Sequence, residues 1–242
     1  MRIFNLANRN FKEIIRDPLS IIFAIILPLF LLFIFQQFNI PAEIYKIENF
    51  TPGIIIFSLS FITLFTATLV AKDRSTSLLT RLGVSPIKPI EYVLGYALSV
   101  IPFVVIQNIL FFIVAIFLGL KISVTIIYTI LIVILISILF IGLGILIGSI
   151  TTEKSASGVS SCVVQLVAFT SGMYFSTDMV GDFFKGFCKI LPFESCLNIT
   201  KGILNANFEN IFSSIIRVLI YTTIIILASI IVFRMKIFNE NK

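Results

Sequence analysis

The side chains that could do chemistry in this chain of 242 residues are concentrated in one polar segment, Lys72 to Glu91, between two apolar runs. Asp73 suits the N-cap of a helix, and Gly83 followed by Pro86 suits its end, so the pattern predicts a short helix over residues 73–82. The alternative is an ordinary positively charged loop. We expect this segment to bind a soluble partner. The candidate binding residues are Asp73, Arg74, Leu78, Leu79, Arg81 and Leu82.

Catalytic chemistry is not indicated. The chain has no histidine, which excludes Ser–His proteolysis, haem ligation by histidine and histidine-dependent zinc sites. It also has no G-x-x-x-x-G-K-[ST] phosphate-binding loop. We therefore expect no enzyme activity, no catalytic residue, no metal and no cofactor held by this chain. If ATP drives the protein, another chain must bind it.

Three neutral amides, Gln107, Asn108 and Gln165, lie inside the apolar runs. They are candidates for lining a translocation path. The alternative, which we favour, is that they hydrogen-bond one helix to another. An ion-coupled transporter normally has an intramembrane carboxylate or unwound helices, and that signal is weak here.

Composition places the chain in a membrane. Hydrophobic residues make up 58%, charged residues only 12%, and the mean hydropathy is +1.11. The apolar runs are long enough for spanning helices and too long for the alternating strands of an outer-membrane barrel. We predict one all-α domain over residues 1–242, with Cys162 buried in its fifth span. The six predicted spans are 19–38, 53–71, 92–118, 124–150, 158–175 and 212–233.

Basic residues indicate the orientation. Segments 1–18, 72–91, 151–157 and 234–242 hold 12 of the 18 lysines and arginines, and such residues accumulate on the cytoplasmic face. We therefore expect both termini in the cytoplasm. The same distribution explains the net charge of +6 without a nucleic-acid partner.

Residues 1–17 have apolar side chains at helical spacing on one face and Arg9, Lys12 and Arg16 on another. This pattern predicts an amphipathic helix lying at the membrane interface, with membrane lipid as a partner. Pro18 disfavours helical geometry at Asp17, so the chain can turn there into the bilayer. A basic tail without fixed structure is the alternative.

The segment 176–210 is too apolar for a free loop and too polar for a span. It predicts one or two short helices that enter the outer leaflet, broken near Pro192. A lid packed on the bundle is equally compatible with the pattern. Cys188 and Cys196 both lie in this segment, and a disulfide between them stays open.

The order of these features resembles the permease subunits of type 2 ABC (ABC-2) exporters over essentially the whole chain. The segments that carry the resemblance are Arg16-Asp17-Pro18, Lys72-Asp-Arg-Ser-Thr-Ser-Leu-Leu-Thr-Arg-Leu-Gly-Val-Ser-Pro86, Glu91-Tyr-Val-Leu-Gly95, Gly142-Leu-Gly144, Ser171-Gly172-Met-Tyr-Phe175 and Leu191-Pro192-Phe193.

The resemblance implies a half-transporter that dimerises with itself or a sibling permease and recruits a separate ATP-binding subunit, which holds ATP and Mg. It identifies residues 73–82 as the coupling helix seated in that subunit. The outer segment is then a candidate exit gate, with Phe183, Phe184, Phe187, Pro192 and Phe193 as its candidate residues.

The expected function is export of a lipophilic or amphipathic drug, peptide or lipid-like substrate across a plasma membrane. The abundance of Ile, Phe, Asn and Lys suggests an AT-rich bacterial genome. Two other classes stay open. One is an autonomous secondary transporter or channel, and the other is a membrane sensor or immunity protein that binds its ligand without moving it.

Overall fold

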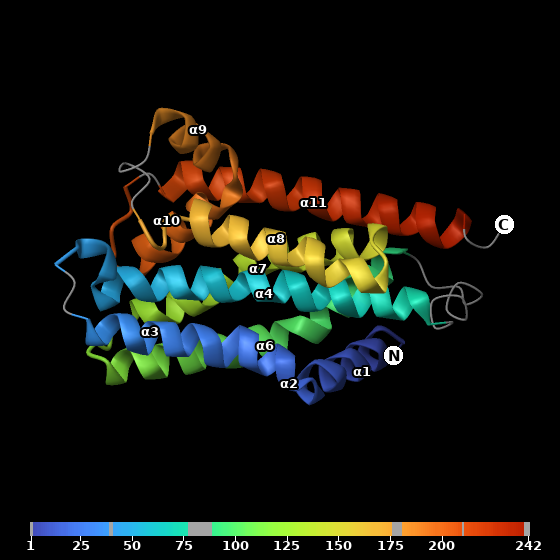
Figure 1. Ribbon diagram of the computed structural model, residues 1–242, viewed down its shortest axis with the longest axis horizontal. Helices are drawn as coiled ribbons and strands as arrows, with labels where there is room; N and C mark the ends of the chain where they lie inside the picture. Colours follow the sequence, from blue (N-terminus) through green and yellow to red (C-terminus); the bar gives the residue numbers. More distant parts are fainter. Residues whose placement is uncertain (1, 39–40, 77–88, 176–180, 210, 240–242) are drawn as a thin grey trace.

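The computed structural model describes residues 2–38, 41–76, 89–175, 181–209 and 211–239, and this part of the chain is helical with no strand. Figure 1 shows the long helices side by side along the longest axis, with both ends of the chain toward one end of the bundle. The elements in chain order are α1 (Arg2–Arg16), α2 (Pro18–Ile21), η1 (Ile22–Ile26), α3 (Leu27–Gln37), η2 (Glu43–Tyr45), α4 (Ile47–Ser75), α6 (Pro89–Phe117), α7 (Thr125–Ile150), α8 (Glu153–Thr170), α9 (Asp182–Ile190), α10 (Pro192–Leu204) and α11 (Ile211–Asn239).

Helix α4 forms the centre of the bundle. Nearly all of its residues from Phe50 to Ala71 are buried, and it packs against α7 and α8 along much of its length. Small residues on α7 allow the close approach, because a Cβ added to Gly148 would lie 2.5 Å from the carbonyl oxygen of Ala67. Thr63 of α4 also donates a hydrogen bond of 2.9 Å to the carbonyl of Phe140 on α7.

Five of the described helical segments are long and apolar enough to cross a membrane, and they match five of the six predicted spans. The fifth predicted span, 158–175, corresponds to α8, which begins at Glu153 and ends at Thr170. Its first turn carries Glu153 and Lys154, and it packs beside α4. The count of six spans therefore stays a prediction. The five matched segments are Pro18–Gln37, Ile47–Ser75, Ile90–Phe117, Thr125–Ile150 and Ile211–Met235.

The first predicted span is one continuous helical path whose second part, η1, is a π-helix. Asp17 begins this path, because its carboxylate accepts hydrogen bonds from the Leu19 amide at 3.3 Å and the Ser20 hydroxyl at 2.6 Å. The predicted turn at Asp17–Pro18 is therefore present, and it separates α1 from the span.

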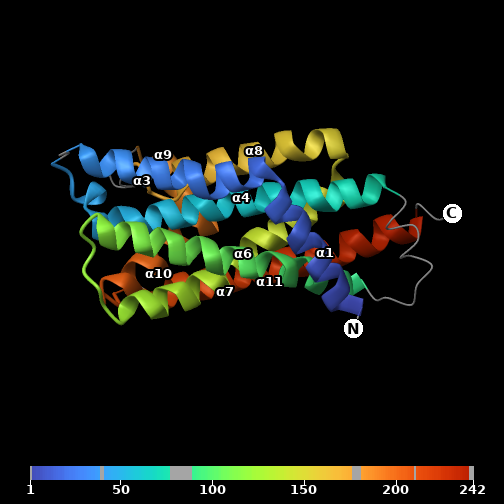
Figure 2. The same ribbon diagram turned by 90° about the horizontal axis from the view of Figure 1, so that it is seen from below.

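The N-terminal helix is also present as α1, and it packs against α6. Figure 2 shows it crossing the bundle obliquely. Its predicted apolar face is divided between two environments. Ala7 and Ile14 are buried in the bundle, whereas Phe4 is 73% exposed and Ile15 is 42% exposed.

Two short helices, α9 and α10, form the described part of the outer segment, and they separate at Leu191–Pro192 as predicted. Helix α10 packs on α4, α7 and α11, so this half of the segment lies against the bundle. Whether either helix enters a membrane stays a prediction. Cys188 and Cys196 are both buried free thiols, and Cys162, which was expected to be buried, is exposed on α8.

Candidate coupling site at the end of α4

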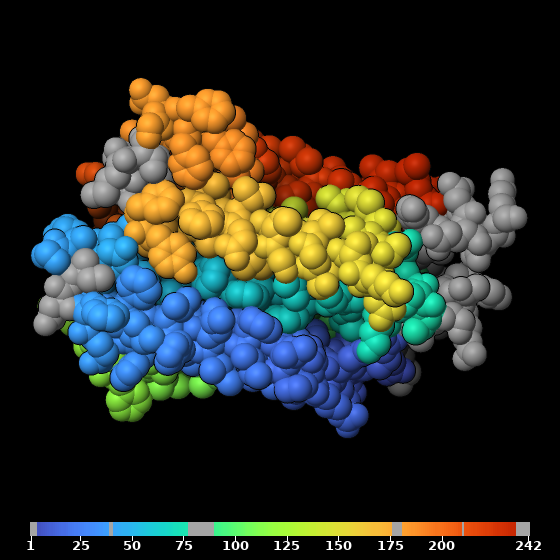
Figure 3. Space-filling view, viewed as in Figure 1, coloured from blue at the N-terminus to red at the C-terminus, as the bar shows by residue number. Residues whose placement is uncertain are grey.

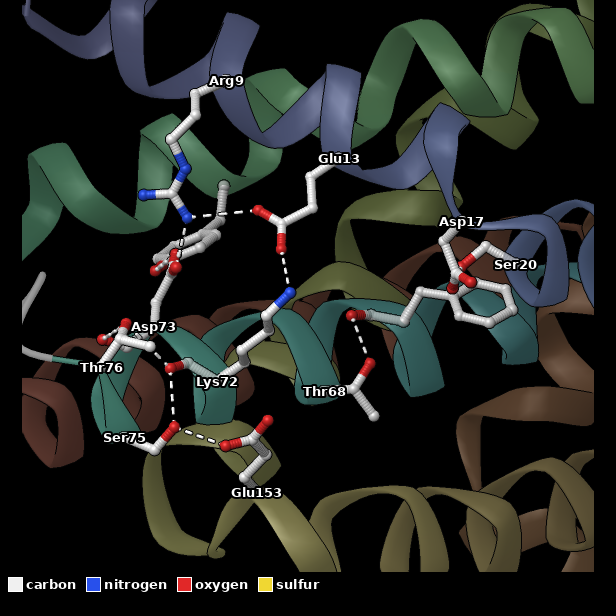
Figure 4. Close-up of polar contacts among 12 residues, drawn as sticks. Arg9, Glu13, Asp17, Ser20, Thr68, Lys72, Asp73, Ser75, Thr76 and Glu153 are labelled. Atoms are coloured by element: carbon white, nitrogen blue, oxygen red, sulfur yellow. Dashed lines mark hydrogen bonds and ion pairs between the residues drawn. The ribbon is translucent and has the colours of Figure 1, made fainter.

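The last turn of α4 carries a buried carboxylate that joins three helices. The side chain of Asp73 is only 4% exposed, and it forms an ion pair with Arg9 of α1. The hydroxyl of Tyr96 on α6 donates a second hydrogen bond to the same carboxylate at 2.7 Å. Figure 4 shows Arg9 reaching from α1 to Asp73. Both carboxylate oxygens are therefore satisfied inside the protein.

A second ion pair lies beside the first. The ammonium of Lys72 on α4 lies 2.6 Å from the Glu13 carboxylate of α1, and Arg9 lies 3.4 Å from the other oxygen of Glu13 (Figure 4). Partial burial opposes ionisation of Glu13, but the hydrogen bond and charge of Lys72, together with Arg9, outweigh burial and lower the pKa of Glu13. Glu13 is therefore held as a carboxylate between two cations.

The next two residues of α4 bind α7 and α8. Arg74 donates hydrogen bonds to backbone carbonyls at the C-terminal end of α7, including that of Ser149 at 2.6 Å. A cation there meets carbonyls that lack helical partners and the negative end of the helix dipole. The Ser75 hydroxyl donates to Glu153 in the first turn of α8 at 2.5 Å. Consecutive residues of one turn thus hold four neighbouring helices.

The predicted start of the coupling helix at Asp73 is wrong. Asp73 and Arg74 belong to the last turn of α4, because Asp73 is held by Arg9 and Tyr96 and does not cap a new helix. The second span accordingly extends beyond its predicted end at Ala71. The other predicted coupling residues, Leu78, Leu79, Arg81 and Leu82, lie outside the described residues.

The three amides of the candidate path do not share one site. Gln107 and Asn108 are buried on α6, where the Gln107 amide donates to the carbonyl of Ala24 in the π-helical turn at 3.0 Å. Asn108 donates to the carbonyl of Val104 in its own helix at 2.7 Å. Gln165 is exposed on α8. The contact made by Gln107 is the helix-to-helix bond that we favoured over a path.

The five gate candidates also fall into two groups. Phe183, Phe184 and Phe187 lie on α9, and the last two line an apolar groove of about 530 Å³ together with residues of α8. Pro192 and Phe193 are buried in the bundle, where the ring of Phe193 stacks on Phe140 with centroids 5.9 Å apart. The two groups therefore lie in different environments in this structure, and their role as a gate stays a prediction.

An aromatic cluster that the sequence did not indicate lies between α3, η2, α4 and the segment after α8. The rings of Phe35 and Tyr45 stack with centroids 5.3 Å apart, and Phe50 packs on both. The Tyr45 hydroxyl donates to the carbonyl of Tyr174 at 2.8 Å. In the sequence these residues could be recognised only as aromatic. No local sequence pattern predicts contacts between residues so far apart in the chain.

Comparison with known proteins identifies the family. A family model described as ABC-2 type transporter matches residues 1–205, which include the elements from α1 through α10. A search of curated proteins found no match. The match covers most of the chain, and it includes all the side chains that meet at the end of α4. This multi-pass, all-helical membrane protein therefore belongs to the ABC-2 type transporter family.

Proposed function

We propose that the chain is the permease subunit of an ATP-driven exporter and that a separate ATP-binding subunit, which holds ATP and Mg, docks at the end of the bundle formed by α1 and the last turn of α4. The observation that carries the proposal is the last turn of α4. Its residues Lys72, Asp73, Arg74 and Ser75 are bound to α1, α6, α7 and α8.

This arrangement supports transmission of force from the docked subunit. Residues 77–88 connect α4 to α6 in the chain, so a partner that moves this segment acts on both helices. Because α4 is the central helix and its last turn is tied to four others, the displacement moves the helices together and does not bend one of them alone. ATP binding then shifts the bundle between two states only if the contacts with the partner differ between them.

A second permease copy is supported by the exposed surface of α8. Ser157, Ser161 and Gln165 are exposed there, although α8 lies along the bundle of spanning helices. Figure 3 shows α8 (yellow) on the face of the molecule toward the viewer, with the surface of α2 and α3 (blue) lower in the same view. Polar side chains in lipid are costly unless other protein groups or water satisfy them. We therefore place the dimer contact and the polar side of a translocation path on this face of α8.

The substrate that fits best is lipophilic or amphipathic. The groove between α8 and α9 is lined by Leu166, Phe169, Phe184 and Phe187, with Gln165 as one of its polar groups. Such a lining binds apolar groups and leaves few hydrogen bonds to orient them. Outward transport, including multidrug efflux, is the direction that the proposal assigns. The proposal also places both termini in the cytoplasm of a bacterial cell, in keeping with their position at one end of the bundle (Figure 1).

The first experiment is purification of the tagged permease from native membranes in mild detergent, with ATP hydrolysis measured and copurifying chains identified by mass spectrometry. We expect an ATPase to copurify, and Leu79→Asp to weaken its association while the permease stays in the membrane. Glu43→Ala, in η2 at the opposite end, is the matched control and should retain the ATPase. A permease that is isolated alone and inert toward ATP would favour an autonomous transporter or a sensor.

The dimer is tested with the native thiol of Cys162, which is exposed on α8. A short bis-maleimide should convert the wild-type permease in membranes to a covalent dimer, and Cys162→Ser should abolish this product. Leu135→Cys in the Cys162→Ser background supplies a control thiol on α7, where Leu135 is 60% exposed. Equal dimer yields from positions 162 and 135 would contradict a contact specific to α8.

A further inference from the structure

An open groove of about 600 Å³ lies at the corner where α1 meets α2. It is separate from the groove between α8 and α9 and shares no lining residue with it. Four cationic side chains and two carboxylates line it, together with Pro18. The lining residues are Arg9, Lys12, Glu13, Arg16, Asp17, Pro18 and Lys72.

The two carboxylates are already engaged within the protein. Glu13 is bound by Lys72 and Arg9, and Asp17 accepts hydrogen bonds from the start of α2. Lys12 and Arg16 are exposed, lie one turn apart on α1, and make no ion pair with any residue that the structure describes. The groove therefore presents two positive charges that no carboxylate of the described chain neutralises.

An apolar surface begins next to these charges. The chain turns at Pro18 into its first span, and large hydrophobic side chains along α2 and η1 are exposed there. Leu19 is 59% exposed and Ile26 is 53% exposed, with Ile22 and Phe23 between them also exposed. Because this span enters the membrane directly after the groove, the charges lie at headgroup depth and the apolar side chains lie beside the acyl chains.

We propose that this groove is a binding site for an anionic phospholipid of the cytoplasmic leaflet. The phosphate of its headgroup is held by the Lys12 ammonium and by the Arg16 guanidinium, which can donate two parallel hydrogen bonds to phosphate oxygens. Its acyl chains lie along Leu19, Ile22 and Phe23. The paired charge and adjoining apolar surface favour a lipid over a soluble phosphate, which would leave the apolar surface uncovered.

Bound lipid would act on the candidate coupling site through α1. Arg9 and Glu13, which hold the last turn of α4, lie on the same helix as Lys12 and Arg16. A lipid at Lys12 and Arg16 therefore holds α1 at the membrane surface and, through Arg9 and Glu13, opposes the joint displacement of α1 and α4.

The test is native mass spectrometry of the full-length protein, purified in mild detergent and mixed with equal amounts of phosphatidylglycerol and phosphatidylcholine that carry the same acyl chains. We expect wild type to retain phosphatidylglycerol preferentially. The double variant Lys12→Gln, Arg16→Gln should bind it more weakly by about fivefold for each charge, or roughly 25-fold in total. The charge-preserving variant Lys12→Arg, Arg16→Lys should retain it.

Lys154→Gln provides the matched control, because Lys154 is an exposed cation in the first turn of α8 at the same end of the bundle and does not line the groove. It should bind phosphatidylglycerol like wild type. Equal retention by wild type and the Lys12→Gln, Arg16→Gln variant would overturn the site, as would an equal loss in Lys154→Gln, which would indicate general attraction to anionic lipid. Complete displacement of the lipid by an equal concentration of inorganic phosphate would overturn the role of the acyl chains.

Discussion

Replacement of Asp73 by alanine should destabilise the protein more than loss of any exposed ion pair, because Asp73 holds both Arg9 and the buried hydroxyl of Tyr96. The alanine leaves the Tyr96 hydroxyl without its acceptor inside the bundle, where an unsatisfied group costs about 1–3 kcal/mol. The side chain of Arg9 is 37% exposed, so water replaces part of its lost interaction. Breaking a fully buried pair costs about 3–5 kcal/mol, and this partial exposure places Asp73→Ala lower, at about 2 kcal/mol.

Tyr96→Phe separates the two contributions. It removes the hydroxyl and its hydrogen bond to Asp73, while the ion pair between Asp73 and Arg9 remains. The expected cost is that of one hydrogen bond to a charged group, about 1.5 kcal/mol. If the two partners of Asp73 are coupled, the double variant Asp73→Ala, Tyr96→Phe should be less destabilised than the sum of the single variants.

The assay is thermal unfolding in detergent, followed with a thiol-reactive dye. Cys188 and Cys196 are buried free thiols that react when the bundle opens, and Cys162→Ser removes the thiol that is exposed in the folded state. For a chain of this length, about 2 kcal/mol corresponds to a decrease in Tm of about 4–8 °C. Tyr96→Phe should lower Tm by about 3–6 °C.

Glu43→Ala is the control, because it removes an ion pair with Lys46 that is exposed at the opposite end of the bundle. It should leave Tm unchanged within the error of the measurement, as expected for exposed pairs. A decrease for Asp73→Ala no larger than that for Glu43→Ala would refute the assignment of Asp73 as a buried link between α1, α4 and α6.

Three further predictions concern other parts of the bundle. Because the pKa of Glu13 is lowered, its contribution to stability is present above the pKa of an unfolded glutamate and is lost as pH falls through the lower folded value. The difference in Tm between wild type and Glu13→Gln should therefore shrink from about pH 7 to about pH 3. A difference that stays constant over this range would contradict the ion pairs of Glu13. Gly148→Ala should lower the free energy of unfolding by about 1–3 kcal/mol, because the added Cβ would lie 2.5 Å from the Ala67 carbonyl oxygen. Gly158→Ala is the control, because a Cβ there meets no atom within 4 Å. Equal Tm values for the two variants would exclude the close packing of α7 on α4. Gln107→Leu should cost about 1 kcal/mol and preserve transport if Gln107 joins α6 to the first span, and loss of transport with Tm retained would instead assign it to the path.

The positions of most helices follow from local properties of the sequence. In lipid, backbone groups must be satisfied within each segment, so a long apolar run predicts a helix whatever its neighbours are. Pro18 and Pro192 likewise mark breaks that the structure contains, because proline lacks a backbone donor and restricts the preceding residue. The amphipathic spacing of residues 1–17 predicted α1 for the same local reason.

Predictions from local sequence were wrong where tertiary contacts or exposure decided the environment of a side chain. Asp73 has the side chain of an N-cap, but Arg9 and Tyr96, which lie 64 and 23 residues away, bind its carboxylate and leave it inside α4. Cys162 lies in a stretch expected to be a buried span, yet it is exposed on α8. Apolar composition gives the environment of a whole span but does not say which of its faces meets another helix.

Local sequence was enough to predict a helical membrane protein and the positions of most of its helices, because helical hydrogen bonds and transfer into lipid depend on residues close together in the chain. The central position of α4, the meeting of Arg9, Asp73 and Tyr96, and the lack of an ion pair between Lys12 or Arg16 and any described residue became evident only from the packing of the helices. Those outcomes depend on how each helix is rotated and which neighbours it contacts, and the spacing of residues along a single helix does not encode either.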